Sequence, residues 1–153
     1  MFHPSSIKPD VELRDYLQGK AKVVVSGGTE KDVTIYGDWE RPTNEVPDDF
    51  IVIMQNGSLG GFGMNLDFAS GYIMLGLYCK LNNDGSVKKN RIEKILTNID
   101  VLVEGLSTDN YFYKYEPQQF ITPTTPNVTS GYSITTLNLR WTTNNKFNKP
   151  VTP

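Results

Sequence analysis

Residues 71–105 constrain the fold more than any other stretch, because an alternating strand pattern is followed there by a helical one. Apolar residues occupy every second position from Ile73 to Leu81, which predicts a strand with one wholly apolar face. Beyond it, apolar residues recur at spacings of three and four, as on one side of an amphipathic helix: Ile92, Ile95, Leu96, Ile99, Leu102 and Val103. The helix is therefore expected to cover a sheet in which this strand is central.

The connection between strand and helix, and the end of the helix, also carry local signals. Residues 82–85 tolerate positive φ, and Ser86 stands where a helix N-cap is expected. Gly105 is expected to end the helix at its C′ position. Cys79 lies on the apolar face of the strand, so we predict a small core residue rather than a nucleophile.

The remaining chain predicts a second, shorter helix and further strands. Asp10 is expected to cap a helix that runs to Gly19. β-branched and aromatic residues predict strands at 22–25, 33–36, 50–54, 111–115 and 132–141, the first two within hairpin distance. Asn56-Gly57 predicts a turn. In the last strand, either both faces are partly covered or a bulge near Thr135-Thr136 shifts the register.

These elements predict an α+β fold class. We expect a mixed, mainly antiparallel sheet, with the long helix and the short N-terminal helix on one face. The length fits a single domain spanning 1–153, with an extended lead at 1–9 and an extended C-terminal arm at 143–153.

Composition bears on function mainly by exclusion. With 38% apolar and 21% charged residues the chain is typical of a soluble globular protein, and no run approaches the roughly 20 apolar residues of a membrane span. The N-terminus lacks the features of a signal peptide, so we expect a cytosolic site of synthesis. A net charge of −2 gives no general attraction to nucleic acid. The single histidine, His3, cannot build a catalytic triad or zinc site, and we predict no enzyme activity, cofactor or metal.

Candidate interaction residues fall into three groups. The glycine-rich segment 57–68 lacks the features of a phosphate-binding loop; it is either a loop that orders against a partner through Leu59 and Phe62, or a plain hairpin excursion. Basic residues gather at the start of the long helix: Lys88, Lys89 and Arg91, with Lys80 and Lys94 nearby. Acidic residues gather in an exposed loop between 37 and 49: Asp38, Glu40, Glu45, Asp48 and Asp49.

The order of these elements resembles the tail-terminator and tail-to-head joining family of long-tailed bacteriophages. The similarity lies in residues 71–81 running into the helix that ends Leu102-Val103-Glu104-Gly105, in the restart at 107–111, and in the final strand from Tyr132 to Trp141. The resemblance covers most of the chain. It implies helices on one face of a mixed sheet and a homo-hexameric ring at the head-proximal end of the tail tube, and it brings no catalytic residue.

The resemblance also implies partners and a location. They are further copies of the chain, the tail tube protein and neck or connector proteins, in a virion assembled in the host cytoplasm, with no membrane and no specific nucleic-acid sequence. A ring is a closed set of contacts between unlike surfaces. We therefore predict that Lys88, Lys89 and Arg91 lie at an interface with an adjacent subunit or a neck protein, with the loop from Glu45 to Asp49 of the adjacent subunit as the leading acidic partner. The alternative is that these side chains form a solvated basic face.

A second class of function stays open from the residues alone. A small β-rich adhesion or carbohydrate-binding module would use an aromatic platform, and the candidates are Tyr111, Tyr113, Tyr115 and Trp39. Solution mass separates the two classes, because such a module is expected to remain monomeric.

Overall fold

The computed structural model describes residues 8–24, 28–40, 47–62, 68–115, 125–127 and 131–143. At 24, 55–62, 68–69 and 125–127 it describes the backbone alone. The predicted N-terminal lead before Lys8 and the predicted arm after Thr143 lie outside these ranges.

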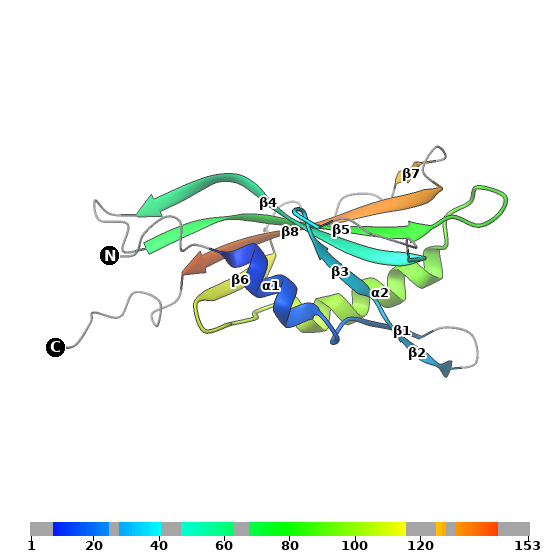
Figure 1. Cartoon of the computed structure of the whole chain (residues 1–153), viewed down its shortest axis with the longest axis horizontal. Coiled ribbons are helices and arrows are strands. Elements are labelled where there is room, and N and C mark those ends of the chain that lie inside the picture. Colours follow the sequence, from blue (N-terminus) through cyan, green and yellow to red (C-terminus); the bar gives the residue numbers. More distant parts are fainter. Residues whose placement is uncertain are drawn as a thin grey trace.

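Two helices and eight strands follow one another along the described chain (Figure 1). In order they are α1 (Pro9–Leu17), β1 (Lys22–Val24), β2 (Glu30–Asp32), β3 (Thr34–Gly37), β4 (Asp49–Phe62), β5 (Phe68–Lys80), α2 (Lys89–Val103), β6 (Tyr111–Tyr115), β7 (Thr125–Asn127) and β8 (Tyr132–Thr143).

The main sheet has the strand order β3-β4-β5-β8-β6, and β7 pairs with the other end of β8. β3 runs parallel to β4, while the pairs β4–β5, β5–β8 and β6–β8 are antiparallel. β1 and β2 form a separate antiparallel hairpin. The fold class is therefore α+β with a mixed, mostly antiparallel sheet, as the sequence predicts.

One face of this sheet and one side of each helix form the core. The β5 face from Ile73 to Leu81 is buried, as are Ile92, Ile95, Ile99 and Val103 of α2, while Leu96 and Leu102 are half-buried against the same core. Leu13 and Leu17 attach α1 to this core. Burial of such side chains stabilises the fold by about 1.5 to 3 kcal/mol each before the loss of chain entropy. The predicted central strand and its covering helix are confirmed.

The opposite face of the sheet carries half-buried aromatic rings. Phe50 stacks on Tyr78 with ring centroids 4.8 Å apart and meets Tyr36 and Tyr132 edge-on at 5.8 and 5.5 Å. β8 alternates strictly along its whole length, with half-buried residues facing this side. Both of its faces are thus partly covered, and the structure has no bulge near Thr135-Thr136.

Several predicted boundaries were wrong. α1 begins at Pro9 after an N-cap at Lys8, so Asp10 lies inside the first turn instead of capping the helix. Ser86 does not cap α2, because its backbone N–H and its hydroxyl both donate to the carboxylate of Asp84 in the preceding turn. The C-terminal boundary at Gly105 is confirmed, with φ 71° just after the C-cap.

Strand pairing differed from expectation at two places. The partner of 22–24 is Glu30–Asp32, and the next strand, β3, joins the main sheet instead. Asn56-Gly57 is not a turn, because β4 continues to Phe62. The strand has a register irregularity between Asn56 and Gly60, and Gly57 lies within it. A β-bulge can accommodate glycine within a strand that continues on both sides of it.

Candidate assembly surface

The start of α2 carries basic side chains for which the described residues supply no ion-pair partner. Lys88 is half-buried, and Lys89 and Lys94 are exposed; none of the three pairs with an acidic group in the part of the chain that the structure describes. The helix start has no side-chain cap and no acidic residue in its first turn. These three residues, here named the cationic patch, therefore leave a concentrated positive charge at a helix N-terminus, where the macrodipole is also positive.

Arg91, predicted to belong to the same surface, points inward instead. Its Nε donates to both carboxylate oxygens of Asp49, at 3.0 and 2.8 Å, and its second terminal nitrogen also pairs with that carboxylate. The Asp49 side chain is only 5% exposed and that of Arg91 24%. This pairing raises the pKa of Arg91 further, so the guanidinium keeps its charge.

The Asp49 carboxylate also faces Cys79. The thiol donates to Oδ1 at 3.1 Å. Burial raises the pKa of the Cys79 thiol to about 12, and the neighbouring carboxylate adds to the shift. Cys79 is therefore a protonated core residue, as predicted.

The acidic loop is consequently not the free surface that the sequence suggested. Asp49 is buried as the first residue of β4, so its prediction as a solvated residue was wrong. Its neighbour Asp48 is exposed and lies 3.8 Å from Lys80 of the same chain. Glu45 lies outside the described residues. The sequence pattern missed the Arg91–Asp49 pair because it joins positions 42 residues apart.

The glycine-rich segment is part of the long β4–β5 hairpin. Its backbone pairs Gly60 with Ser70 and Phe62 with Phe68. The hairpin therefore extends past Ser70, where the pairing of β5 with β8 ends (Figure 1). The hairpin alternative is thus confirmed for the backbone. The side chains of Leu59 and Phe62 lie outside the described part, and their role as anchors stays a prediction.

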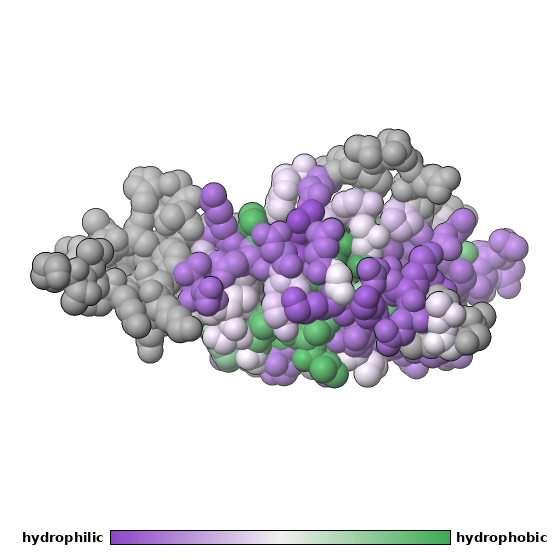
Figure 2. Space-filling view, turned by 60° about the horizontal axis from the view of Figure 1, so that its bottom comes forward, coloured by the Kyte–Doolittle hydropathy of each residue, from purple (hydrophilic) through white to green (hydrophobic). Residues whose placement is uncertain are grey.

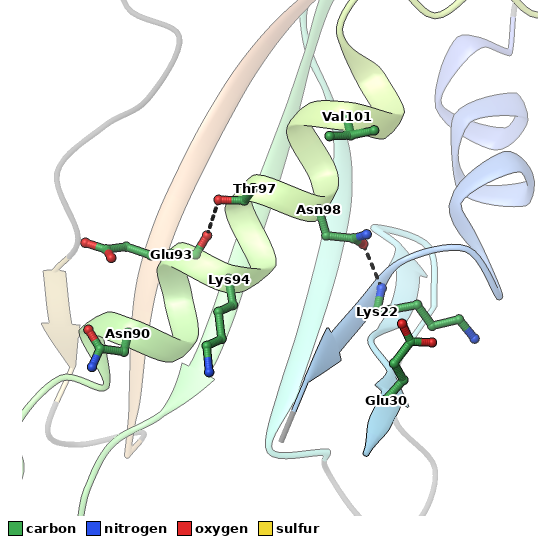
Figure 3. A pocket seen from close by; sticks show the side chains of 8 residues that line it. All are labelled: Lys22, Glu30, Asn90, Glu93, Lys94, Thr97, Asn98 and Val101. Atoms are coloured by element: carbon green, nitrogen blue, oxygen red, sulfur yellow. Dashed lines mark hydrogen bonds between the residues drawn. The ribbon is translucent and has the colours of Figure 1, made fainter. Parts of the chain in front are cut away.

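A wide surface groove of about 840 Å³ runs between the outer side of α2 and the β1–β2 hairpin (Figure 3). Lys22 donates its backbone N–H to the side-chain oxygen of Asn98 at 2.7 Å, which ties the hairpin to the helix. The helix contributes a polar stripe and the exposed Val101: Asn90, Glu93, Lys94, Thr97, Asn98 and Val101. Figure 2, with this side turned forward, shows a largely hydrophilic surface with limited hydrophobic areas. The mixed charge and open shape suit a macromolecular contact better than an enclosed small ligand.

The other end of α2 is acidic, a feature that was not predicted from the sequence. Asp100, Glu104 and Asp109 are exposed and form no ion pair in the described ranges. Tyr115 contacts two of these acidic residues. Its backbone N–H donates to Glu104 Oε2 at 3.4 Å, and its side chain hydrogen-bonds Asp100. Burial and these acidic neighbours raise the pKa of Tyr115. The i, i+4 spacing of Asp100 and Glu104 near a helix C-terminus was the signal available in the sequence.

The proposed aromatic platform does not exist as a surface. Tyr111 and Tyr113 are 1% and 0% exposed. Their hydroxyl groups bond the start of α1: Tyr111 accepts from the Lys8 N–H at 2.7 Å, and Tyr113 donates to the Pro9 carbonyl at 2.7 Å. Trp39 is 51% exposed and stands apart from them, with its ring over Gly37. The alternation of β6 turns its tyrosines inward, which aromatic density alone does not reveal.

Two further properties concern the described residues as a whole. Among them, no group of three or more His, Cys, Asp or Glu side chains is placed to hold a metal ion. None of their helices is both long and apolar enough to span a membrane.

Comparison with known proteins yields no match, either to a protein-family model or to a curated protein sequence.

Proposed function

We propose that this protein is a structural subunit of a long-tailed bacteriophage particle, forming a homo-hexameric ring at the head-proximal end of the tail tube and joining the tail to the neck. The observation that carries the proposal is the order of elements. A short helix, strands, a central strand leading into a long helix, an aromatic strand and a final strand follow one another as in tail terminators. Both helices contribute to the core on one face of a mixed sheet, as that resemblance implies.

The charge distribution supports self-assembly. A ring needs two unlike surfaces on every subunit, since one surface meets a different surface of its neighbour. The chain offers exposed charges of opposite sign at the two ends of α2, and neither set is neutralised within the described residues. Exposed charge pairs contribute only about 0.2 to 1 kcal/mol each, so they set orientation while apolar contacts supply most of the affinity.

The proposal assigns a purely structural role. Its partners are other copies of the chain, the tail tube protein and the neck or connector proteins, within the virion. It involves no catalysis, no cofactor, no membrane and no recognition of a nucleic-acid sequence.

The decisive experiment is tail-tube capping. The purified protein is added to tail tube protein from the same phage under conditions of tube growth, and tube lengths are measured by negative-stain electron microscopy. Tubes that stop growing and carry added density at one end are expected. Immunogold labelling of intact particles should mark the head–tail junction. Unchanged tube growth together with label elsewhere on the particle, or none, would refute the proposal.

The alternative of a monomeric module with an aromatic platform has lost its main support. Tyr111 and Tyr113 use their rings in the core and their hydroxyl groups in bonds to residues 8 and 9. No other observation in the described residues favours that class over assembly.

A further inference from the structure

The charges of α2 run opposite to its macrodipole at both ends. Acidic groups are favoured near a helix N-terminus and basic groups near a C-terminus. Here the first turn has no acidic residue and the last turn has no basic residue. The cationic patch lies at the start of the helix, and Asp100, Glu104 and Asp109, here named the acidic end, lie at and beyond its last turn. A neighbour that brings opposite charge to each end would offset both unfavourable placements.

Neither set of charges has an ion-pair partner among the described residues. The ion pairs between described residues use other side chains: Arg14, Asp15, Lys22, Asp32, Glu40, Asp48, Asp49, Lys80 and Arg91. Tyr115 contacts the acidic end: its backbone N–H donates to Glu104 Oε2 at 3.4 Å, and its side chain hydrogen-bonds Asp100. Oriented charges lose less conformational freedom when a partner binds them.

We propose that the acidic end of α2 in one copy docks on the cationic patch of the next copy. This inference rests on the proposed ring and names its intersubunit contact. It replaces the loop from Glu45 to Asp49 as the acidic half, because Asp49 is buried against Arg91 and Asp48 is paired with Lys80. The partner of this surface is thus a second copy of the same chain.

The two charged ends allow head-to-tail addition. α2 spans 15 residues, about 22 Å at about 1.5 Å per residue, so its two charged ends are well separated. The acidic set continues off the helix to Asp109. Each copy therefore offers both halves of the contact at once, and a bound neighbour leaves the second half free. Such a contact propagates until a ring closes.

An exposed apolar side chain lies beside the acidic end. Val101 is 77% exposed, the highest value among the large hydrophobic residues that the structure describes as exposed. It adjoins Asp100 and also lines the groove beside α2 (Figure 3). A docked neighbour would remove it from water, which adds an apolar contribution that salt does not screen.

Two charge-reversed variants test the proposal. One carries Lys88→Glu and Lys89→Glu, and the other carries Glu104→Lys and Asp109→Lys. Both place charges that suit the helix dipole, so thermal unfolding should be unchanged or slightly higher for each. At about 50 mM salt, each variant alone should need about 10-fold or more higher concentration for half-assembly, measured by native mass spectrometry and light scattering.

Mixing the two variants provides the sharper measurement. In an equimolar mixture, every negative start meets a positive end, so rings of wild-type mass containing both variants should return. For the lysine reversals, the control is Lys31→Glu with Lys114→Glu, which makes the same change in net charge at two exposed lysines outside α2, on β2 and β6. That control should assemble like the wild type.

The inference would be overturned by normal assembly of each reversed variant alone, by failure of the mixture to assemble, or by closed dimers as the only assembly product. A wild-type chain that remains monomeric at all concentrations would do the same. None of these decides the proposed function, which stands or falls on tail-tube capping and the position of the label on the particle.

Discussion

Arg91 in the first turn of α2 holds the carboxylate of Asp49, the first residue of β4, through a two-pronged contact in which its Nε lies 3.0 and 2.8 Å from the two oxygens. The same carboxylate accepts a hydrogen bond from the Cys79 thiol of β5. One buried charge thus connects the helix start with two neighbouring strands. Its removal would leave the Arg91 guanidinium without its partner.

Replacing Asp49 by asparagine should lower the free energy of unfolding by about 3 kcal/mol, because the Arg91 charge would lose its partner in a poorly hydrated position. Equilibrium denaturation in urea measures the loss. Asp48→Asn is the matched control: its pair with Lys80 is exposed and 3.8 Å long, so less than about 1 kcal/mol should be lost. Equal losses in the two variants would contradict the structural role assigned to Asp49.

The Cys79 thiol should be nearly inert in the folded protein. Its pKa is raised to about 12, and the side chain is 1% exposed, whereas an unfolded chain has a thiol pKa near 9. At pH 9 the reaction with a thiol reagent should be at least about 100-fold slower in the native state than in urea. Comparable rates would show that the thiol is accessible.

The raised thiol pKa also has a defined effect on stability. The folded state holds the proton more tightly than the unfolded state, so the stabilisation is complete below about pH 9 and is lost as the pH rises towards 12. Unfolding free energies between pH 8.5 and 10 should therefore fall more steeply for the wild type than for Cys79→Ala. Parallel curves would exclude the thiol as the cause.

Truncation along α2 should separate its buried and exposed sides. Ile95→Ala should cost about 2 to 5 kcal/mol, since Ile95 is 0% exposed in the core. Val101→Ala, on the outer side and 77% exposed, should change the free energy of unfolding by less than about 0.5 kcal/mol. A loss below about 1 kcal/mol at Ile95 would mean that α2 is peripheral to stability.

Two glycines of β5 should respond differently to alanine. A Cβ at Gly71 would lie 2.8 Å from the ring of Trp141, which is fully buried and cannot move aside, so we expect a loss of about 1 to 3 kcal/mol. At Gly76 the nearest atom is 3.3 Å away, at the end of the half-buried Tyr78 side chain, and a smaller loss is expected. Thermal unfolding of both variants tests this ranking, which the reverse order would disprove.

Local pattern was sufficient for the elements whose signal repeats along the chain. The alternation from Ile73 to Leu81, the three-and-four spacing from Ile92 to Val103 and Gly105 as a helix stop all correspond to what the structure contains. Burial of a continuous apolar stripe dominates the energy of such elements, so their neighbours in space hardly change the outcome.

Local pattern does not predict features for which two hydrogen-bond or strand-pairing partners compete. Ser86 could have capped α2, but the turn at Asp84 uses its hydrogen bonds. Residues 33–36 could have formed a hairpin with 22–25, but β3 joins β4 in parallel. For Ser86 a local turn uses the groups that a helix cap would need, and for residues 33–36 pairing with a strand distant in the sequence replaces the hairpin.

The sequence by itself therefore determined the fold class, the central strand with its covering helix, and the concentration of lysines at the start of that helix. Only the tertiary structure decided which charges are free. It placed Asp49 against Arg91, left Lys88 and Lys89 without an ion-pair partner among the described residues, and turned Tyr111 and Tyr113 into the core. The physical reason is the separation of the interacting residues along the chain. Periodic burial is encoded by residues close together in the sequence, whereas ion pairing joins positions that only folding brings within a few ångströms.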